Sequence, residues 1–145
     1  MKSLILTHFF LFSTLGLNIT KTVVVSSNIN VDKSTLLELN PQNVYLELLK
    51  QDVKHPEIVL RQSILETGWF DCKNCSLESN NIFGFYYKGK YIKFDSWQES
   101  VAYYKRWQTR HYKGGDYYAF LIKVGFASDP SYIKMLKSVK IQPEE

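Results

Sequence analysis

Apolar residues recur at helical spacing along the chain after Pro41. The first predicted helix begins at this proline, and its apolar face consists of Val44, Leu46, Leu48, Leu49 and Val53. His55-Pro56 interrupts the pattern and begins a second predicted helix, which ends before Gly68. Its expected buried side consists of Ile58, Val59, Ile64 and Leu65.

A short aromatic region in the middle of the chain predicts a β-hairpin. Residues 83–87 and 91–94 are aromatic and apolar, and they flank a turn that contains Gly89. Ser96 and Glu99 then match a capping box at the start of a third helix. Two shorter helices are expected over residues 116–124 and after Asp129-Pro130. The pattern therefore predicts an α+β fold that is mainly helical.

The N-terminal stretch differs from the rest of the chain. Lys2 supplies one positive charge, and residues 4–17 are then almost wholly apolar. This pattern is typical of a secretory signal peptide, and it is shorter than the roughly 20 residues of a membrane span. We predict a signal peptide over 1–25, a polar lead-in over 26–40 and one domain over 41–145, without a stable membrane span after processing. Gly16 and Ser27 are candidate cleavage residues; an uncleaved anchor and a buried N-terminal helix are the alternatives.

The composition fits one packed domain and adds little about partners. The 145 residues are 45% hydrophobic and 22% charged, which excludes an intrinsically disordered chain. The net charge of +4 is spread along the chain without a block of basic residues. Such a mild excess fits an ordinary solvated surface or attraction to an anionic polymer, and no nucleic-acid partner is expected.

The two cysteines lie close together, in the sequence Cys72-Lys73-Asn74-Cys75. In an exported protein this spacing predicts a short local disulfide. A metal site would need further ligands, and after residue 25 the chain has only two histidines, His55 and His111. The pattern shows no βαβ unit for a thioredoxin-like redox site. We therefore expect a structural disulfide, no metal ion and no organic cofactor.

One carboxyl group has a position that suits acid catalysis. Glu66 lies at the C-terminal end of the second predicted helix, beside Ile64, Leu65 and Trp69. The negative end of the helix dipole and the apolar neighbours both disfavour the carboxylate, so both raise the pKa of Glu66. A carboxyl that stays protonated near neutral pH can act as the general acid of a glycosidase, a pattern well known from lysozyme. An exposed surface glutamate is the alternative.

Four short segments are the most distinctive in the chain. They are residues 64–69 (Ile-Leu-Glu-Thr-Gly-Trp), 80–85 (Asn-Asn-Ile-Phe-Gly-Phe), 94–100 (Phe-Asp-Ser-Trp-Gln-Glu-Ser) and 125–132 (Gly-Phe-Ala-Ser-Asp-Pro-Ser-Tyr). In this order, within residues 56–140, they resemble the peptidoglycan glucosaminidases of glycoside hydrolase family 73, in the lysozyme-like superfamily. Thr67 stands where the family has Ser, and Phe126 where it has Tyr.

The resemblance implies a lysozyme-like domain in which a helical lobe and a hairpin lobe flank a glycan cleft. By this resemblance Glu66 corresponds to the catalytic acid. Two interpretations, platforms for sugar rings or parts of the core, apply to the aromatic residues Trp69, Phe83, Tyr86, Tyr87 and Trp97. Asn81 hydrogen-bonds either an N-acetyl group or a turn. The predicted substrate-binding residues are Trp69, Asn81, Phe83, Gly84, Phe126 and Tyr132.

The second catalytic group is open. A partner carboxyl would lie about 5 to 9.5 Å from the acid. Glu99 corresponds to a family glutamate, although the capping box alone would explain it, and Asp95 is the alternative. Asp71 and Glu78 are further candidates, and the N-acetyl group of the substrate could replace a partner carboxyl.

Together these patterns predict an exported enzyme that works as a monomer in the periplasm, in the cell envelope or outside the cell. It is expected to be a β-N-acetylglucosaminidase that cleaves β-1,4 bonds of peptidoglycan glycan strands, with Glu66 as general acid. A lytic transglycosylase or a muramidase is the alternative among enzymes. A glycan-binding or assembly module without turnover is the alternative from another class, favoured by Phe126 and by the unassigned second acid.

Overall fold

Helices are the main secondary structure in the computed structural model, which describes residues 23–25, 38–126 and 129–143. The elements, in order, are β1 (Val23–Val25), α1 (Pro41–Lys50), α2 (Pro56–Thr67), the short 3-10 helix η2 (Ser76–Ser79), β2 (Tyr86–Tyr87), β3 (Lys90–Tyr91), α3 (Trp97–His111), α4 (Tyr117–Lys123), α5 (Tyr132–Ser138) and β4 (Ile141–Pro143). Most of the predicted signal peptide and lead-in lies outside the described residues. Within the described part, no helix is both long enough and apolar enough to cross a membrane.

Local sequence signals set the ends of α1 and α2. The Asn40 side chain accepts a hydrogen bond from the Asn43 backbone N–H at 2.8 Å, and Pro41 follows as the first residue of α1. Pro56 is likewise the first residue of α2, and Gly68 ends α2 in the left-handed conformation with φ of 53°. The predicted starts of both helices and the predicted end of α2 are confirmed, whereas α1 ends at Lys50, before Val53 of its predicted apolar face.

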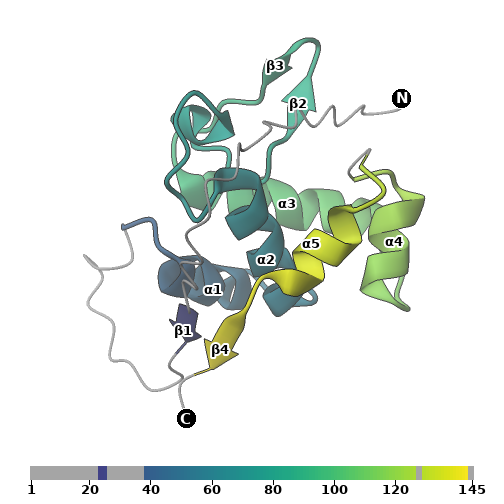
Figure 1. Ribbon diagram of the computed structural model, residues 1–145. Coiled ribbons are helices and arrows are strands. Elements are labelled where there is room, and N and C mark those ends of the chain that lie inside the picture. Colours follow the sequence, from purple (N-terminus) through teal and green to yellow (C-terminus); the bar gives the residue numbers. More distant parts are fainter. Residues whose placement is uncertain (1–22, 26–37, 127–128, 144–145) are drawn as a thin grey trace.

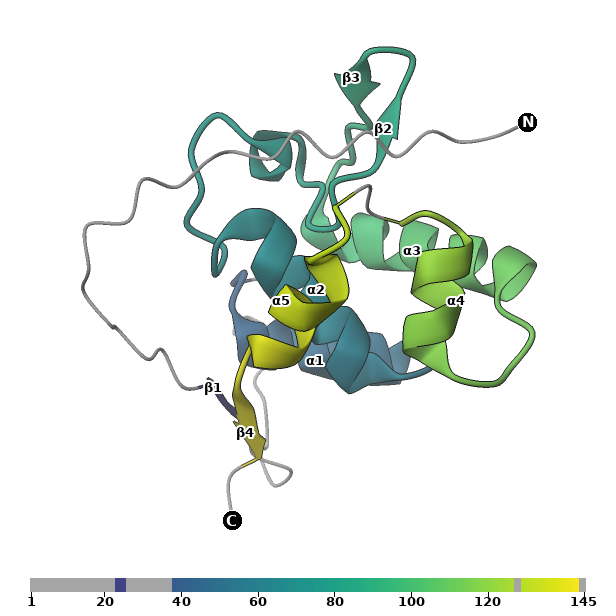
Figure 2. The same cartoon turned by 45° about the vertical axis from the view of Figure 1, so that its right-hand side comes forward.

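The core lies where α2 and α3 pack together with the other helices (Figures 1 and 2). α2 contacts both α1 and α5, and α3 also contacts α1. The fully buried side chains include Val44, Leu48, Val59, Leu60, Ile82, Phe83, Val101, Tyr104, Phe126 and Leu136. This arrangement holds α2 between elements that are far apart in the sequence.

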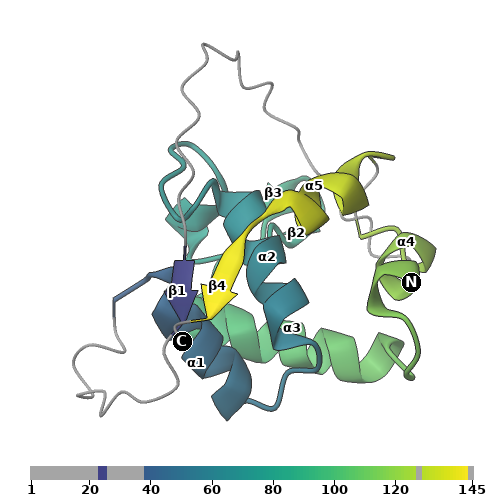
Figure 3. The same cartoon turned by 60° about the horizontal axis from the view of Figure 1, so that its bottom comes forward.

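The described residues form two small sheets, which lie at opposite ends of the helices (Figure 1). β2 and β3 form the predicted antiparallel hairpin around Lys88-Gly89, but each strand has only two residues. We call residues 76–95, which include η2 and this hairpin, the hairpin lobe. β1 and β4 pair in parallel, with Val23 opposite Ile141 (Figure 3). Because β1 lies inside the predicted signal peptide, cleavage after Ser27 would remove it, and cleavage after Gly16 would retain it.

The observed fold is α+β and mainly helical, which confirms the predicted fold class. α2 ends beneath the hairpin lobe (Figures 1 and 2), so its last turn lies where the helices and the hairpin lobe meet. The fold thereby places Glu66, in that last turn, at the junction between the two parts of the molecule.

Candidate active site

The carboxyl group of Glu66 packs directly against the backbone of Gly84 in the hairpin lobe. A Cβ atom added at Gly84 would lie 2.9 Å from Glu66 Oε2, which is closer than two such atoms can approach. Gly84 also has φ of 66°, a conformation that other residues rarely adopt. The sequence analysis names Gly84 as a substrate-binding residue; in the structure the group that it approaches is the candidate acid itself.

A left-handed turn follows Glu66 and fixes the end of α2. Gly68, Trp69 and Phe70 all have positive φ, between 53° and 65°. The buried Thr67 hydroxyl donates to the Ser63 carbonyl oxygen at 2.6 Å and accepts from the Phe70 backbone N–H at 3.0 Å. The hydroxyl that Thr67 shares with the serine of the family motif therefore has a defined role, since it holds this turn.

Burial favours the protonated form of the Glu66 carboxyl near neutral pH. Desolvation raises the pKa of Glu66 from 4.5 to about 7, and a hydrogen bond from Tyr132 opposes this rise. Oε1 of the same carboxyl is buried and has no hydrogen-bond partner among the described residues. Glu66 Oε1 is therefore a buried polar atom whose hydrogen-bonding capacity is not used by the described residues.

The loop before the hairpin is organised by Asn81. Its buried side-chain amide donates to the carbonyl oxygens of Phe85 (2.8 Å) and Ile92 (2.9 Å), and its oxygen accepts from the Phe85 N–H (3.0 Å). Of the two sequence-based interpretations of Asn81, these contacts support the turn and not the N-acetyl group. Asn81 acts on the site by shaping the loop that carries Gly84.

The predicted aromatic site residues differ in exposure. Phe83 and Phe126 are 0% exposed and belong to the core, where the Phe126 ring lies 6.1 Å from that of Tyr132. Tyr132 is 5% exposed and directs its hydroxyl to Glu66. Trp69 is half-buried and packs against the core. The structure thus brings Tyr132 to the acid, and it places Phe83 and Phe126 behind the site.

Two candidates for the second carboxyl, Glu99 and Asp95, lie in and just before the first turn of α3. Glu99 is exposed, and its Oε2 accepts from the Asp95 backbone N–H at 2.8 Å. The Glu99 N–H in turn donates to Ser96 Oγ at 3.2 Å, which confirms the capping box. Asp95 is exposed as well. No second carboxyl among the described residues contributes to the pKa of Glu66.

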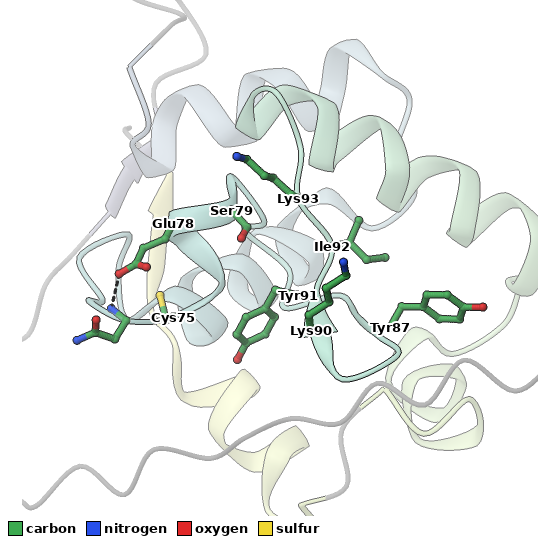
Figure 4. Close-up of a pocket in the computed structure, with 9 residues that line it drawn as sticks. Cys75, Glu78, Ser79, Tyr87, Lys90, Tyr91, Ile92 and Lys93 are labelled. Atoms are coloured by element: carbon green, nitrogen blue, oxygen red, sulfur yellow. Dashed lines mark hydrogen bonds between the residues drawn. The ribbon is translucent and has the colours of Figure 1, made fainter.

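The other two candidates lie in the loop after α2. Asp71 is exposed, and Glu78 Oε1 accepts from the Asn74 backbone N–H at 2.8 Å. Glu78 lines an open pocket of about 760 Å³ between η2 and the hairpin (Figure 4). The lining residues are Asn74, Cys75, Glu78, Ser79, Tyr87, Lys90, Tyr91, Ile92 and Lys93.

Tyr91 connects this pocket to Glu66. Its side chain lines the pocket, and a negative charge on Glu66 raises the pKa of Tyr91 further, after the larger effect of burial. Tyr87, on the neighbouring strand, is 52% exposed. Sequence reasoning did not assign Tyr91 to the site, because nothing in the local pattern says which hairpin residue faces the end of α2.

The cysteines form the predicted disulfide, Cys72–Cys75, in the loop after α2. Cys75 also lines the pocket. Among the described residues, no group of three or more His, Cys, Asp or Glu side chains is arranged to hold a metal ion.

The domain is mainly helical α+β, and a glutamate carboxyl is buried where a helix end meets the hairpin lobe, which is consistent with the lysozyme-like class of folds. Residues 42–142 match the model of the Glucosaminidase family, described as mannosyl-glycoprotein endo-beta-N-acetylglucosaminidase. This match spans more than half of the 145 residues, so the chain belongs to that family. The resemblance stated from the sequence is confirmed, and the domain is of a glycoside hydrolase type with a glycan as substrate. No curated protein and no solved structure matches the chain.

Proposed function

We propose that this protein is an exported peptidoglycan hydrolase, a β-N-acetylglucosaminidase that cleaves β-1,4 glycosidic bonds with Glu66 as general acid. The observation that carries the proposal is the buried Glu66 carboxyl, whose pKa burial raises to about 7 and whose Oε1 has no partner among the described residues. The family supports glycan hydrolysis in general. The Glu66 assignment adds the group that protonates the leaving sugar.

In the proposed first step the protonated Glu66 donates its proton to the glycosidic oxygen. The bond between that oxygen and the anomeric carbon breaks, and the leaving sugar departs as an alcohol. Glu66 becomes a carboxylate, which Tyr132 stabilises by its hydrogen bond. The anomeric carbon carries the developing positive charge and needs a nucleophile on its other face.

We propose that the N-acetyl oxygen of the substrate supplies this nucleophile. It bonds to the anomeric carbon to form a cyclic intermediate; water then attacks the same carbon and gives its proton to the Glu66 carboxylate. This route is supported by the position of Glu99, which is exposed and accepts the Asp95 backbone N–H in the cap of α3. Glu99 and Asp95 are the alternatives.

The pocket beside Tyr91 is the proposed place for the glycan strand. It is open, and aromatic side chains from both hairpin strands, Tyr87 and Tyr91, line it. Flat aromatic faces suit the apolar faces of sugar rings. Tyr91 would therefore contact the sugar nearest to Glu66, and Tyr87 would contact one farther along the strand.

A digest of purified peptidoglycan tests the enzyme and its acid together. Wild type, Glu66→Gln, Glu99→Gln and Asp95→Asn are incubated with peptidoglycan, the fragments are reduced with borohydride, and their ends are identified by mass spectrometry. We expect reduced N-acetylglucosamine ends from wild type, and at least about 100-fold fewer from Glu66→Gln. Full activity of the Glu99 and Asp95 variants supports the substrate-assisted route, whereas loss in one of them assigns it as the second carboxyl.

Other products would correct the proposal in defined ways. Reduced muramic acid ends would make the protein a muramidase, and anhydromuramic ends would make it a lytic transglycosylase. Binding to insoluble wall without release of fragments would favour the second candidate, a glycan-binding module. That candidate draws on the same exposed position of Glu99 in the cap of α3.

Export and the monomeric state stay predictions. The disulfide is compatible with an oxidising compartment. N-terminal sequencing of the secreted protein tests the signal peptide, and it shows whether the mature chain begins before or after β1. An intact Met1 on a cytosolic product would contradict export.

A further inference from the structure

A connected series of buried hydrogen bonds, called here the hydrogen-bond chain, begins at Gln108. The backbone groups of Lys54 fix the orientation of the Gln108 side-chain amide. Gln108, which is 1% exposed, donates from Nε2 to the Lys54 carbonyl oxygen, and its Oε1 accepts from the Lys54 N–H, both at 2.8 Å. A backbone N–H only donates and a carbonyl only accepts, so the Gln108 amide has one possible orientation. Its second Nε2 hydrogen donates to the Tyr117 hydroxyl at 2.8 Å.

The later bonds continue in the same direction. Tyr104 donates its single hydroxyl hydrogen to Gln62 Oε1 at 2.6 Å. In the 2.7 Å bond between the two hydroxyls Tyr117 is therefore the donor, since Tyr104 has no second hydrogen. This leaves the Gln62 Nε2 to donate to the Tyr132 hydroxyl oxygen at 3.5 Å. Each group accepts from one neighbour and donates to the next.

The chain ends at Glu66. Since the Tyr132 oxygen accepts from Gln62, its hydrogen is directed to the Glu66 carboxyl. Gln62 is 0% exposed, and Tyr104 and Tyr117 are buried as well, so water does not offer competing partners along the path.

We propose that Gln62, Tyr104, Tyr117 and Gln108 are positioning residues that keep the Tyr132 hydroxyl hydrogen directed at the Glu66 carboxyl. The inference rests on the proposed role of Glu66 as the acid. It deepens that role by naming what holds the hydrogen bond that stabilises the carboxylate after proton transfer. These residues lie in α2, α3 and α4, behind the site, and none of them lines the pocket.

Removing the Tyr104 hydroxyl should reverse the direction of the hydrogen bond between Gln62 and Tyr132. In Tyr104→Phe the Gln62 Oε1 loses its donor, and rotation of the amide lets this oxygen accept from Tyr132. The Tyr132 hydrogen then leaves Glu66, the carboxylate loses a stabilising hydrogen bond, and the pKa of Glu66 rises. The titratable groups that act on Glu66 from neighbouring elements are Tyr132 on α5 and Tyr91 on β3, and neither is changed.

The test is a pH titration of the Glu66 carboxyl carbon by NMR in the full exported protein. The variants are Tyr104→Phe, Tyr132→Phe and the double substitution. We expect the Glu66 midpoint to move upward by about one pH unit in each single variant, since a hydrogen bond to a charged group is lost. In the double variant the midpoint should equal that of Tyr132→Phe, because Tyr104 acts only through Tyr132.

Tyr103→Phe is the matched control. Tyr103 is the neighbouring residue on α3, and its ring packs against Phe85 and Phe94 outside the hydrogen-bond chain. We expect its Glu66 midpoint to match wild type. If Tyr104→Phe does not fold, Tyr132→Phe still tests the last bond, since it removes the hydrogen that is directed to Glu66, and an unchanged Glu66 midpoint there would overturn the inference as well.

Two results would overturn the inference: an unchanged Glu66 midpoint in folded Tyr104→Phe, or single-variant shifts that add up in the double variant. Both results are independent of turnover, because the titration needs no substrate. If the midpoints move as expected and peptidoglycan is not cleaved, the positioning chain stands and the proposed enzymatic function fails.

Discussion

The end of α2 and the start of α3 each carry a glutamate, and the two differ in almost every physical respect. Glu66, in the last turn of α2, is packed against Gly84, and one of its oxygens is buried without a partner among the described residues. Glu99, in the first turn of α3, is exposed and accepts the Asp95 backbone N–H. The same side chain is thus held in an apolar environment at one helix end and in a hydrogen-bonded cap at the other.

The difference follows from the direction of a helix. Free N–H groups and the positive end of the dipole favour a carboxylate at an N-terminus, whereas the C-terminus disfavours it. Burial adds to the second effect at Glu66 and raises its pKa to about 7. Glu99 therefore stabilises its helix. Burial of the Glu66 carboxyl keeps it protonated and lowers the stability of the folded protein near neutral pH. This contrast separates a structural acid from a candidate reactive one.

The largest expected effect is on the pH dependence of folding stability. Between pH 4.5 and about 7 the folded state holds a proton on Glu66 that the unfolded state has released, so wild type loses stability as pH rises through this range. Glu66→Gln has no such proton. Its stability relative to wild type should increase from pH 4 to pH 8 by up to about 3 kcal/mol, as measured by urea unfolding.

Glu99→Gln is the control for that experiment. Glutamine also serves in a capping box, and the side chain is exposed, so its stability relative to wild type should vary little over the same pH range. Equal pH profiles for Glu66→Gln and wild type would show that Glu66 has an ordinary acidity, which would remove the main support for its role.

The second effect concerns the contact between Gly84 and Glu66. A Cβ in Gly84→Ala would lie 2.9 Å from Glu66 Oε2 and would displace the carboxyl, so peptidoglycan cleavage should fall about 100-fold. Gly89→Ala is a matched control, since Gly89 also has positive φ but has no atom within 4 Å of an added Cβ. Both variants carry similar backbone strain. Equal activity of the two would contradict the importance of the contact.

A third effect is expected in the loop that follows α2. The Cys72–Cys75 disulfide closes a very short loop, so replacing both cysteines by serine should lower the free energy of unfolding by about 2 kcal/mol. Reduction of wild type with dithiothreitol should give the same loss. Unchanged thermal stability after complete reduction would show that the hydrogen bonds of Thr67 hold the loop without the disulfide.

The smallest effect is expected at the cap of α3. Ser96→Ala removes the acceptor of the Glu99 N–H and should lower stability by about 1 kcal/mol without changing peptidoglycan cleavage. Thermal unfolding and the digest, measured on the same preparation, check both parts. A large loss of cleavage with intact folding would show that the start of α3 takes part in the site after all.

Much of the fold could be predicted because its signals are local. Pro41, Pro56 and Gly68 mark helix ends through their own backbone preferences, and the Ser96–Glu99 capping box acts within one turn. The hairpin was predicted from its aromatic strands and glycine turn, although the paired part is shorter than the aromatic run. Glu66 was singled out because its helix end and apolar neighbours are both visible in the sequence.

The rest depends on contacts between distant segments. Periodicity does not show that β1 pairs with β4, because no local signal encodes a partner more than a hundred residues away. It shows that Phe83 and Phe126 are apolar, but only packing decides that they lie behind the site and not in it. The approach of Gly84 to Glu66 likewise joins two segments through a loop shaped by Asn81.

By itself, the sequence determined the helices, their caps, the family and the identity of the candidate acid. Only the tertiary structure decided the acidity of Glu66 and the direction of its hydrogen bond. The physical reason is that burial and hydrogen-bond orientation depend on groups from α2, α3, α4 and α5 meeting in one core. A helix end can carry a glutamate in any exposed position, and the surrounding core makes this one hold its proton.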